Sequence, residues 1–298
     1  MKKKHNANGT KKLLRRVRKK RLKTVAVLPS LVTVLNGICG FAAISFAASG
    51  KGAFALAGYM ILIAMIADVL DGRLARISQS TSSFGGQLDS MCDIISFGVA
   101  PAFLMLKVFD AKLNTLGGTS PFLLIFFSRF VWISAAGYLS CSAIRLARFN
   151  VENEENESAH MSFLGLPTPA AAGVIISLVI FNQEALDEFS IQAGWLRYIC
   201  QDLVLFALPF VSLCLAVLMV GRIRYPHVVN QYIKGKKPFS HLIKLLVMVG
   251  LIIWNRQVAL VVMFCGYSFN GFFRWFYYKI LSTSWVLRRQ PKPQSTSG

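Results

Sequence analysis

The sequence predicts an all-α fold, a polytopic membrane helix bundle of about eight transmembrane helices with both termini in the cytoplasm. Composition is the first observation that favours this fold, because 54% of the residues are hydrophobic and only 15% are charged. The second is that the apolar residues stand in long blocks. Crossing a bilayer takes about 20 such residues, and several blocks reach that length.

The predicted helices follow one another through short connections. Their ranges are 26–48, 54–75, 86–108, 120–146, 167–182, 202–221, 241–255 and 257–281. Together they make one predicted membrane domain, 25–285. A basic N-terminal arm, 1–24, precedes it, and a tail poor in core-forming residues, 286–298, follows it and is expected to be disordered.

The basic residues predict the orientation of the bundle. The formal net charge is +20, and 12 of the 33 Lys and Arg precede Val25. An even number of helices puts both termini on one side, and the positive-inside rule makes that side the cytoplasm. Because the basic residues flank apolar blocks, we expect no nucleic acid partner. The arm either lies on anionic lipid or serves only as a topology signal.

Four aspartates stand at the inner ends of two otherwise apolar predicted helices: Asp68, Asp71, Asp89 and Asp93. A carboxylate near hydrocarbon is costly, so each is a functional candidate. Spacings of three and four residues put each pair on one helical face, and a short loop can turn the two faces together. Four converging carboxylates would repel one another without cations, and an all-oxygen ligand set suits Mg²⁺ or Mn²⁺.

The segment 68–93 resembles the signature of the CDP-alcohol phosphotransferase family, D-x2-D-G-x2-A-R-x8-G-x3-D-x3-D, at every fixed position. The resemblance implies an enzyme with two metal ions bound by the four aspartates. It makes Asp93 also the general base that takes a proton from the acceptor alcohol. An ion transporter is the alternative of another class, but it does not explain Arg76 and the glycines of the signature.

The resemblance also implies a pocket for the CDP group. In the signature it is lined by Gly72, Ala75, Arg76 and Gly85. The first helix resembles the family pattern P-x3-T-x2-N-x3-G, which adds Thr33 and Asn36 to the pocket. Packing between helices through small and polar residues is the alternative role for this face.

Three further stretches resemble the phosphatidylserine synthase branch of this family. They are 96–102 (SFGVAPA), 145–151 (RLARFNV) with 165–173 (GLPTPAAAG), and 222–226 (RIRYP). The implied reaction moves the phosphatidyl group of CDP-diacylglycerol to L-serine, giving phosphatidylserine and CMP. A synthase of the same family that uses glycerol 3-phosphate or an inositol-type acceptor is the alternative.

Two arginines and an amide stand at the cytoplasmic end of the fourth predicted helix, at the depth of the aspartates: Arg145, Arg148 and Asn150. Guanidinium groups bind carboxylates in a bidentate manner, so these residues are candidates for holding serine. Binding the donor diphosphate and anchoring the helix at the lipid surface are the other two roles. The resemblance further implies a homodimer. A prokaryotic inner membrane is the expected location, and because the aspartates stand at the predicted inner ends of their helices, we expect the active site to face the cytoplasm.

Overall fold

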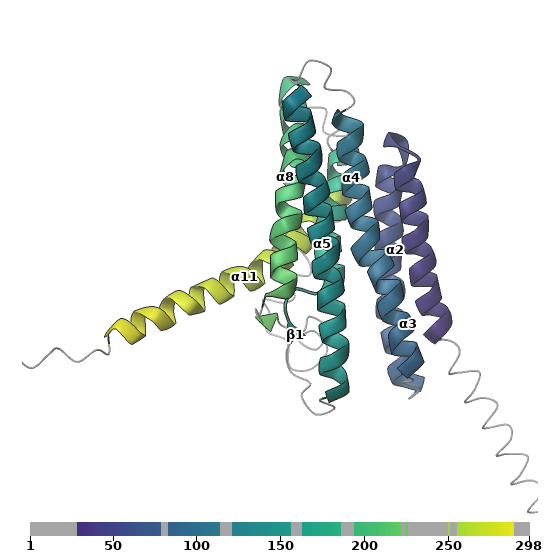
Figure 1. Cartoon of the computed structure of the whole chain (residues 1–298), viewed down its shortest axis with the longest axis vertical. Helices are drawn as coiled ribbons and strands as arrows, with labels where there is room; N and C mark the ends of the chain where they lie inside the picture. Colours follow the sequence, from purple (N-terminus) through teal and green to yellow (C-terminus); the bar gives the residue numbers. More distant parts are fainter. Residues whose placement is uncertain are drawn as a thin grey trace, which may run out of the picture.

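The computed structural model describes residues 29–78, 83–113, 121–155, 163–185, 194–221, 224–225, 250 and 255–288. Long helices packed side by side dominate this part of the chain (Figure 1). In chain order the elements are the helix Pro29–Ala48, η1 (Lys51–Ala53), α2 (Phe54–Ser78), α3 (Ser83–Asp93), η2 (Ile94–Val99), α4 (Ala100–Leu113), α5 (Pro121–Glu155), β1 (Phe163–Leu164), α6 (Thr168–Ile180), η3 (Phe181–Ala185), α8 (Gly194–Val220), β2 (Arg224–Tyr225) and α11 (Arg256–Arg288).

The all-α prediction is confirmed, apart from the two-residue pair β1–β2. Among the described residues, five helices are long and apolar enough to cross a membrane. They are Pro29–Ala48, Lys51–Leu74, Phe84–Leu113, Leu124–Val151 and Ile199–Val220. The total of eight spans and the cytoplasmic termini stay predictions.

Helices occupy every predicted range except 241–255, of which only residues 250 and 255 are described. Several helices are longer than predicted: α5 continues to Glu155, and α8 already begins at Gly194. The arm 1–24 and the tail beyond Arg288 lie outside the described residues.

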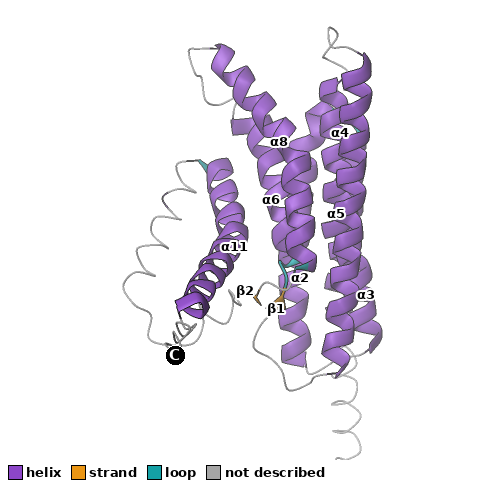
Figure 2. Ribbon diagram, turned by 60° about the vertical axis from the view of Figure 1, so that its left-hand side comes forward, coloured by secondary structure: helices purple, strands orange, loops and turns teal. Residues whose placement is uncertain are grey.

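The centre of the bundle is α6, which packs against α2, α8 and α11 (Figure 2). Nearly all of its side chains are buried, and the first half is built from small residues. Small residues let neighbouring helices come close. On α2, for example, a Cβ placed on Gly58 would lie 2.8 Å from Ile180 Cγ1. At its far end α11 leans away from the bundle (Figure 1).

One of the five spans, Phe84–Leu113, contains the short π-helix η2 immediately after Asp93. A π-helical turn changes which residues face a neighbouring helix, and such turns are frequent at functional sites. Two hydroxyl groups fix this one. Tyr138 donates a hydrogen bond to the Phe97 carbonyl (2.9 Å), and Ser96 donates one to the Asn36 carbonyl (2.9 Å).

Candidate active site

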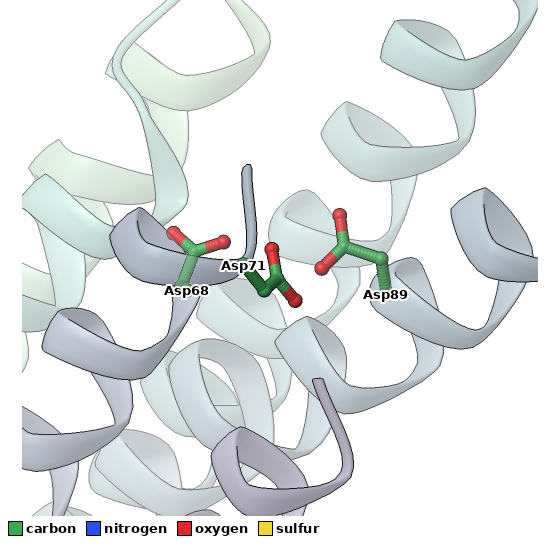
Figure 3. A group of neighbouring side chains, drawn as sticks. All are labelled: Asp68, Asp71 and Asp89. Atoms are coloured by element: carbon green, nitrogen blue, oxygen red, sulfur yellow. The ribbon is translucent and has the colours of Figure 1, made fainter. Parts of the chain in front are cut away.

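Three aspartates converge at one end of the bundle. Asp68 and Asp71 come from α2 and Asp89 from α3, and their carboxylates point toward a common centre (Figure 3). One ligand oxygen from each lies within 4.8 Å of the others. The expected meeting of the two helical faces is therefore present for these three residues.

This group fits a hard divalent cation. The ligands are all carboxylate oxygens, which Mg²⁺ and Mn²⁺ prefer. Asp89 Oδ1 is buried and has no hydrogen-bond partner in the described part of the chain. There, none of the three carboxylates forms an ion pair with a basic side chain. Like charges held this close to hydrocarbon need a counterion, so the site can bind a metal.

Asp93 is not part of this group, although it lies within electrostatic reach of Asp68 and Asp89. Its side chain is 8% exposed. The amide of Asn36 donates a hydrogen bond of 2.9 Å to Asp93 Oδ1. This contact fixes one carboxylate oxygen of Asp93. Its predicted roles as ligand of a second metal and as general base stay predictions.

The first helix contacts the aspartates directly. Besides the bond from Asn36, the Thr33 hydroxyl donates a hydrogen bond of 2.5 Å to Asp71 Oδ2. Both side chains are buried. We had expected Thr33 and Asn36 in the CDP pocket, whereas the contacts that the structure gives them are to carboxylates. Their role in nucleotide binding is untested.

The first helix reaches the aspartates because it crosses η2 at a short distance. A Cβ on Gly40 would lie 2.8 Å from Ser96 Cα, so only glycine lets the first helix approach η2 this closely. Ser96 then holds the Asn36 carbonyl. Sequence reasoning singled out neither Ser96 nor Tyr138 as individual residues. Ser96 had entered only as the first residue of the stretch 96–102, three residues after Asp93.

The residues predicted for the CDP pocket lie on the same two helices. Gly72 follows Asp71 on α2, and within the described part of the chain a Cβ there would meet no atom closer than 4 Å. Gly85 stands near the start of α3. Ala75 and Arg76 continue α2, but their side chains fall outside the described part of the chain.

The three acceptor candidates on α5 differ in their contacts. Arg145 lies within electrostatic reach of Asp93 and Asp68. Its Nη1 donates a hydrogen bond of 2.8 Å to Thr168 Oγ1, and its Nε is buried with no partner in the described part of the chain. Arg148 is half-buried on the same helix.

Asn150 makes a different contact. It exchanges hydrogen bonds of 2.8 and 3.1 Å with Ser90, the residue after Asp89, so it ties α5 to α3. Sequence reasoning missed Ser90 and Thr168 as partners of these residues. Thr168 could have been noticed because it sits between two prolines, directly before a helix made of small residues.

A bundle of helices apolar enough to span a membrane, with three carboxylates that can hold a divalent cation at one end, is the arrangement expected of a metal-dependent membrane enzyme. The family model of CDP-alcohol phosphatidyltransferase matches residues 26–206. The match covers more than half of the chain, which therefore belongs to the CDP-alcohol phosphatidyltransferase family. The predicted family and enzyme class are confirmed.

Curated relatives carry the name of the branch that the sequence resembles. The CDP-diacylglycerol–serine O-phosphatidyltransferase of Helicobacter pylori (strain 26695) is 31% identical over 252 residues, covering 84% of this chain and 92% of the relative. Its namesake from Methanocaldococcus jannaschii is 29% identical over 210 residues, covering 70% and 79%. One from Saccharomyces cerevisiae is 32% identical over 176 residues, covering 56% and 58%.

Proposed function

We propose that the chain transfers the phosphatidyl group of CDP-diacylglycerol to the hydroxyl of L-serine, giving phosphatidylserine and CMP. The observation that carries the proposal is the group of Asp68, Asp71 and Asp89, gathered within 4.8 Å at one end of a membrane bundle. Family membership supplies the donor, and the names of the relatives support serine as the acceptor.

Four residues would hold two divalent cations, Mg²⁺ or Mn²⁺. Asp68, Asp71 and Asp89 are assigned to one, and Asp68, Asp89 and Asp93 to the other. Bound cations of this kind neutralise the donor diphosphate and stabilise the charge that develops on the leaving CMP. The support for the first assignment is the short separation of the three carboxylates and the unpaired Oδ1 of Asp89.

Asp93 acts as the general base. Because Asn36 occupies its Oδ1, the other oxygen is left for the acceptor. The serine hydroxyl gives its proton to Asp93, and its oxygen bonds to the phosphorus that bears the lipid. The bond between that phosphorus and the CMP oxygen breaks in the same displacement, so no covalent enzyme intermediate is needed.

The donor lies along α2 and α3. We place the CDP group against the signature residues Gly72, Ala75, Arg76 and Gly85. The open space at Gly72 supports this placement, since a helix face without a side chain leaves room for a nucleotide. Arg145 holds the carboxylate of serine, with Arg148 near the diphosphate or the lipid surface.

The enzyme would be an integral membrane protein of a prokaryotic inner membrane, with its site open to the cytoplasm and CDP-diacylglycerol arriving from the inner leaflet. We assign one membrane domain, 25–285, flanked by the arm 1–24 and the tail 286–298. The five candidate spans agree with this location. A homodimer is proposed on family resemblance alone.

The test is CMP release by the purified protein in detergent, with CDP-diacylglycerol and Mn²⁺. L-Serine, glycerol 3-phosphate and inositol are compared side by side as acceptors. We expect release with serine alone. Release with another alcohol would keep the family site and overturn the acceptor. No release with any of them, from folded protein with metal present, would favour the ion transporter.

A further inference from the structure

We propose that Thr168 is a positioning residue for acceptor choice: its hydroxyl aims Arg145 at the carboxylate of the acceptor, so that amino alcohols bearing a carboxylate are preferred. The proposal rests on the function proposed above and extends it to a residue on another helix. Thr168 is the first residue of α6, and the aspartates are on α2 and α3.

Arg145 has bonding capacity left for a ligand. A guanidinium presents five N–H donors in a planar fork. Thr168 Oγ1 accepts one of them at 2.8 Å, and the buried Nε donates to nothing in the described part of the chain. No carboxylate there lies within ion-pair distance of Arg145. A half-buried cation with a buried, unused donor fits a carboxylate supplied by a ligand.

The position of Arg145 also suits serine. Its charge interacts with those of Asp93 and Asp68 without an ion pair to either. An acceptor whose hydroxyl meets Asp93 and whose carboxylate meets Arg145 joins the two groups. A neutral acceptor gains nothing from Arg145, so this one side chain discriminates between the two classes of alcohol.

The backbone next to Thr168 is held by contacts that do not involve the Thr168 hydroxyl. Gly165 has φ +86°, a conformation that favours glycine, and it packs on the Met219 carbonyl of α8. Next to it, the Leu166 amide donates a hydrogen bond of 3.0 Å to the Leu218 carbonyl. The pairing of β1 with β2 fixes the two residues directly before Gly165. Thr168 itself is 0% exposed, so its hydroxyl is held rigidly toward Arg145.

A structural role for the same bond predicts a different outcome. If Thr168 only satisfied a half-buried arginine, its loss would weaken the fold and impair both substrates and all acceptors alike. If it aims Arg145 at a carboxylate, its loss affects serine selectively. The two roles can be separated by kinetics.

The experiment uses the full chain in detergent and compares wild type with Thr168→Val, which keeps the shape and removes the acceptor oxygen. The KM for L-serine, the KM for CDP-diacylglycerol and the inhibition constant of L-serinamide, which lacks the carboxylate charge, are measured by CMP release. We expect the serine KM to rise roughly tenfold, the effect of one lost hydrogen bond to a charged group. The other two constants stay within about twofold, which is small on this scale.

Two further variants serve as a rescue and a control for Thr168→Val. Thr168→Ser keeps the hydroxyl and is expected to restore the serine KM. Ser177→Ala removes another buried hydroxyl of α6, which donates to the Val174 carbonyl of its own helix at 3.0 Å. It should leave the serine KM unchanged. If Thr168→Val does not fold, Thr168→Cys takes its place, because a thiol has similar volume and accepts hydrogen bonds poorly.

Parallel increases in the serine KM and the serinamide constant, or no change in either, would overturn the role of Thr168 while leaving the proposed function intact. A wild-type protein that releases CMP only with a different alcohol would instead overturn the proposed function, and the assignment of Thr168 with it. A selective rise in the serine KM, rescued by Thr168→Ser, supports both.

Discussion

The carboxylates at the two ends of the bundle differ in whether a basic side chain of the protein pairs with them. At the end that contains Asp68, Asp71, Asp89 and Asp93, called here the aspartate end, no ion pair to these residues exists in the described part of the chain. At the other end, called the Glu184 end, Glu184 Oε2 accepts hydrogen bonds from Tyr59 (2.6 Å), Gln257 (3.1 Å) and Arg256 (3.5 Å).

The same contrast holds for a second acid at the Glu184 end. Asp202 on α8 pairs with Lys112 on α4 at 2.5 Å. A buried charge is tolerated when protein groups compensate it, and it is costly when they do not. Compensated acids at one end join helices to each other. At the aspartate end the bonds to Asp71 and Asp93 come from the neutral groups of Thr33 and Asn36, and no basic side chain pairs with the four acids in the described part of the chain. The proposed metal ions would supply the compensating positive charge.

Asp93→Asn should have the largest effect. Loss of a general base costs about 10²–10⁴-fold in rate, and we expect kcat to fall by about 10³-fold. The fold should persist, because the variant removes one charge from a group of like charges. CMP release and thermal unfolding in detergent measure the two effects.

The matched control for that variant is Asp110→Asn. Asp110 belongs to the same span, on α4, away from the aspartate end. It should retain wild-type kcat. Equal loss of activity in both variants, or full activity in Asp93→Asn, would contradict the distinction between the two ends.

Much of the fold follows from the sequence because apolar length and basic flanks reflect the bilayer itself. The ends of the helices were less predictable. Hydrophobicity indicates where a helix leaves the lipid, whereas α5 continues to Glu155 through a polar stretch that includes three glutamates, which favour helix. The π-helix η2 could not be predicted, because it depends on hydrogen bonds to two other helices, from the Tyr138 hydroxyl of α5 and to the Asn36 carbonyl of the first helix.

The site was predictable to the extent that its residues are local. Asp68, Asp71 and Asp89 are close in sequence, and helical periodicity brings them together. The bonds of Thr33 to Asp71 and of Arg145 to Thr168 join different helices, and no spacing in the sequence predicts them. Tertiary packing decides such pairs.

The second largest expected effect is the change in Tm caused by Mn²⁺, which should depend on the aspartate end and not on the Glu184 end. A ligand that binds only the folded state stabilises it by about 2.7 kcal/mol at a concentration 100 times its Kd. We expect Mn²⁺ to raise the Tm of the wild-type protein, and EDTA to reverse the rise. Asp89→Asn should lose most of this shift, since it removes one of three ligands.

Glu184→Gln serves as the control, because Glu184 is bonded by protein groups at the other end and should keep the full Mn²⁺ shift. The measurement is thermal unfolding of each variant with Mn²⁺ and with EDTA. A shift of the same size in Asp89→Asn would place the bound cation elsewhere.

Gly72→Ala tests the open helix face at the aspartate end. A Cβ there meets no atom of the described residues within 4 Å, and alanine favours helix over glycine, so stability should hold or rise by about 0.5–1 kcal/mol. If the space belongs to the CDP group, the KM for CDP-diacylglycerol should rise roughly tenfold, equivalent to about 1.4 kcal/mol. Gly52→Ala, equally open but on η1, should change neither KM. An unchanged donor KM in Gly72→Ala would show that the nucleotide lies elsewhere.

Glu184→Gln should have the smallest effect, and on stability alone. Three donors from α2 and α11 converge on one carboxylate oxygen, and a neutral amide keeps the shape but weakens each charge-assisted bond. We expect a loss of about 1 kcal/mol in the free energy of unfolding. The kcat and both KM values should match those of wild type, because the helices that carry the aspartates are still held by the packing of α6. Thermal unfolding and CMP release test this pair of statements. A fall in kcat without a fall in Tm would mean that the Glu184 end takes part in the reaction.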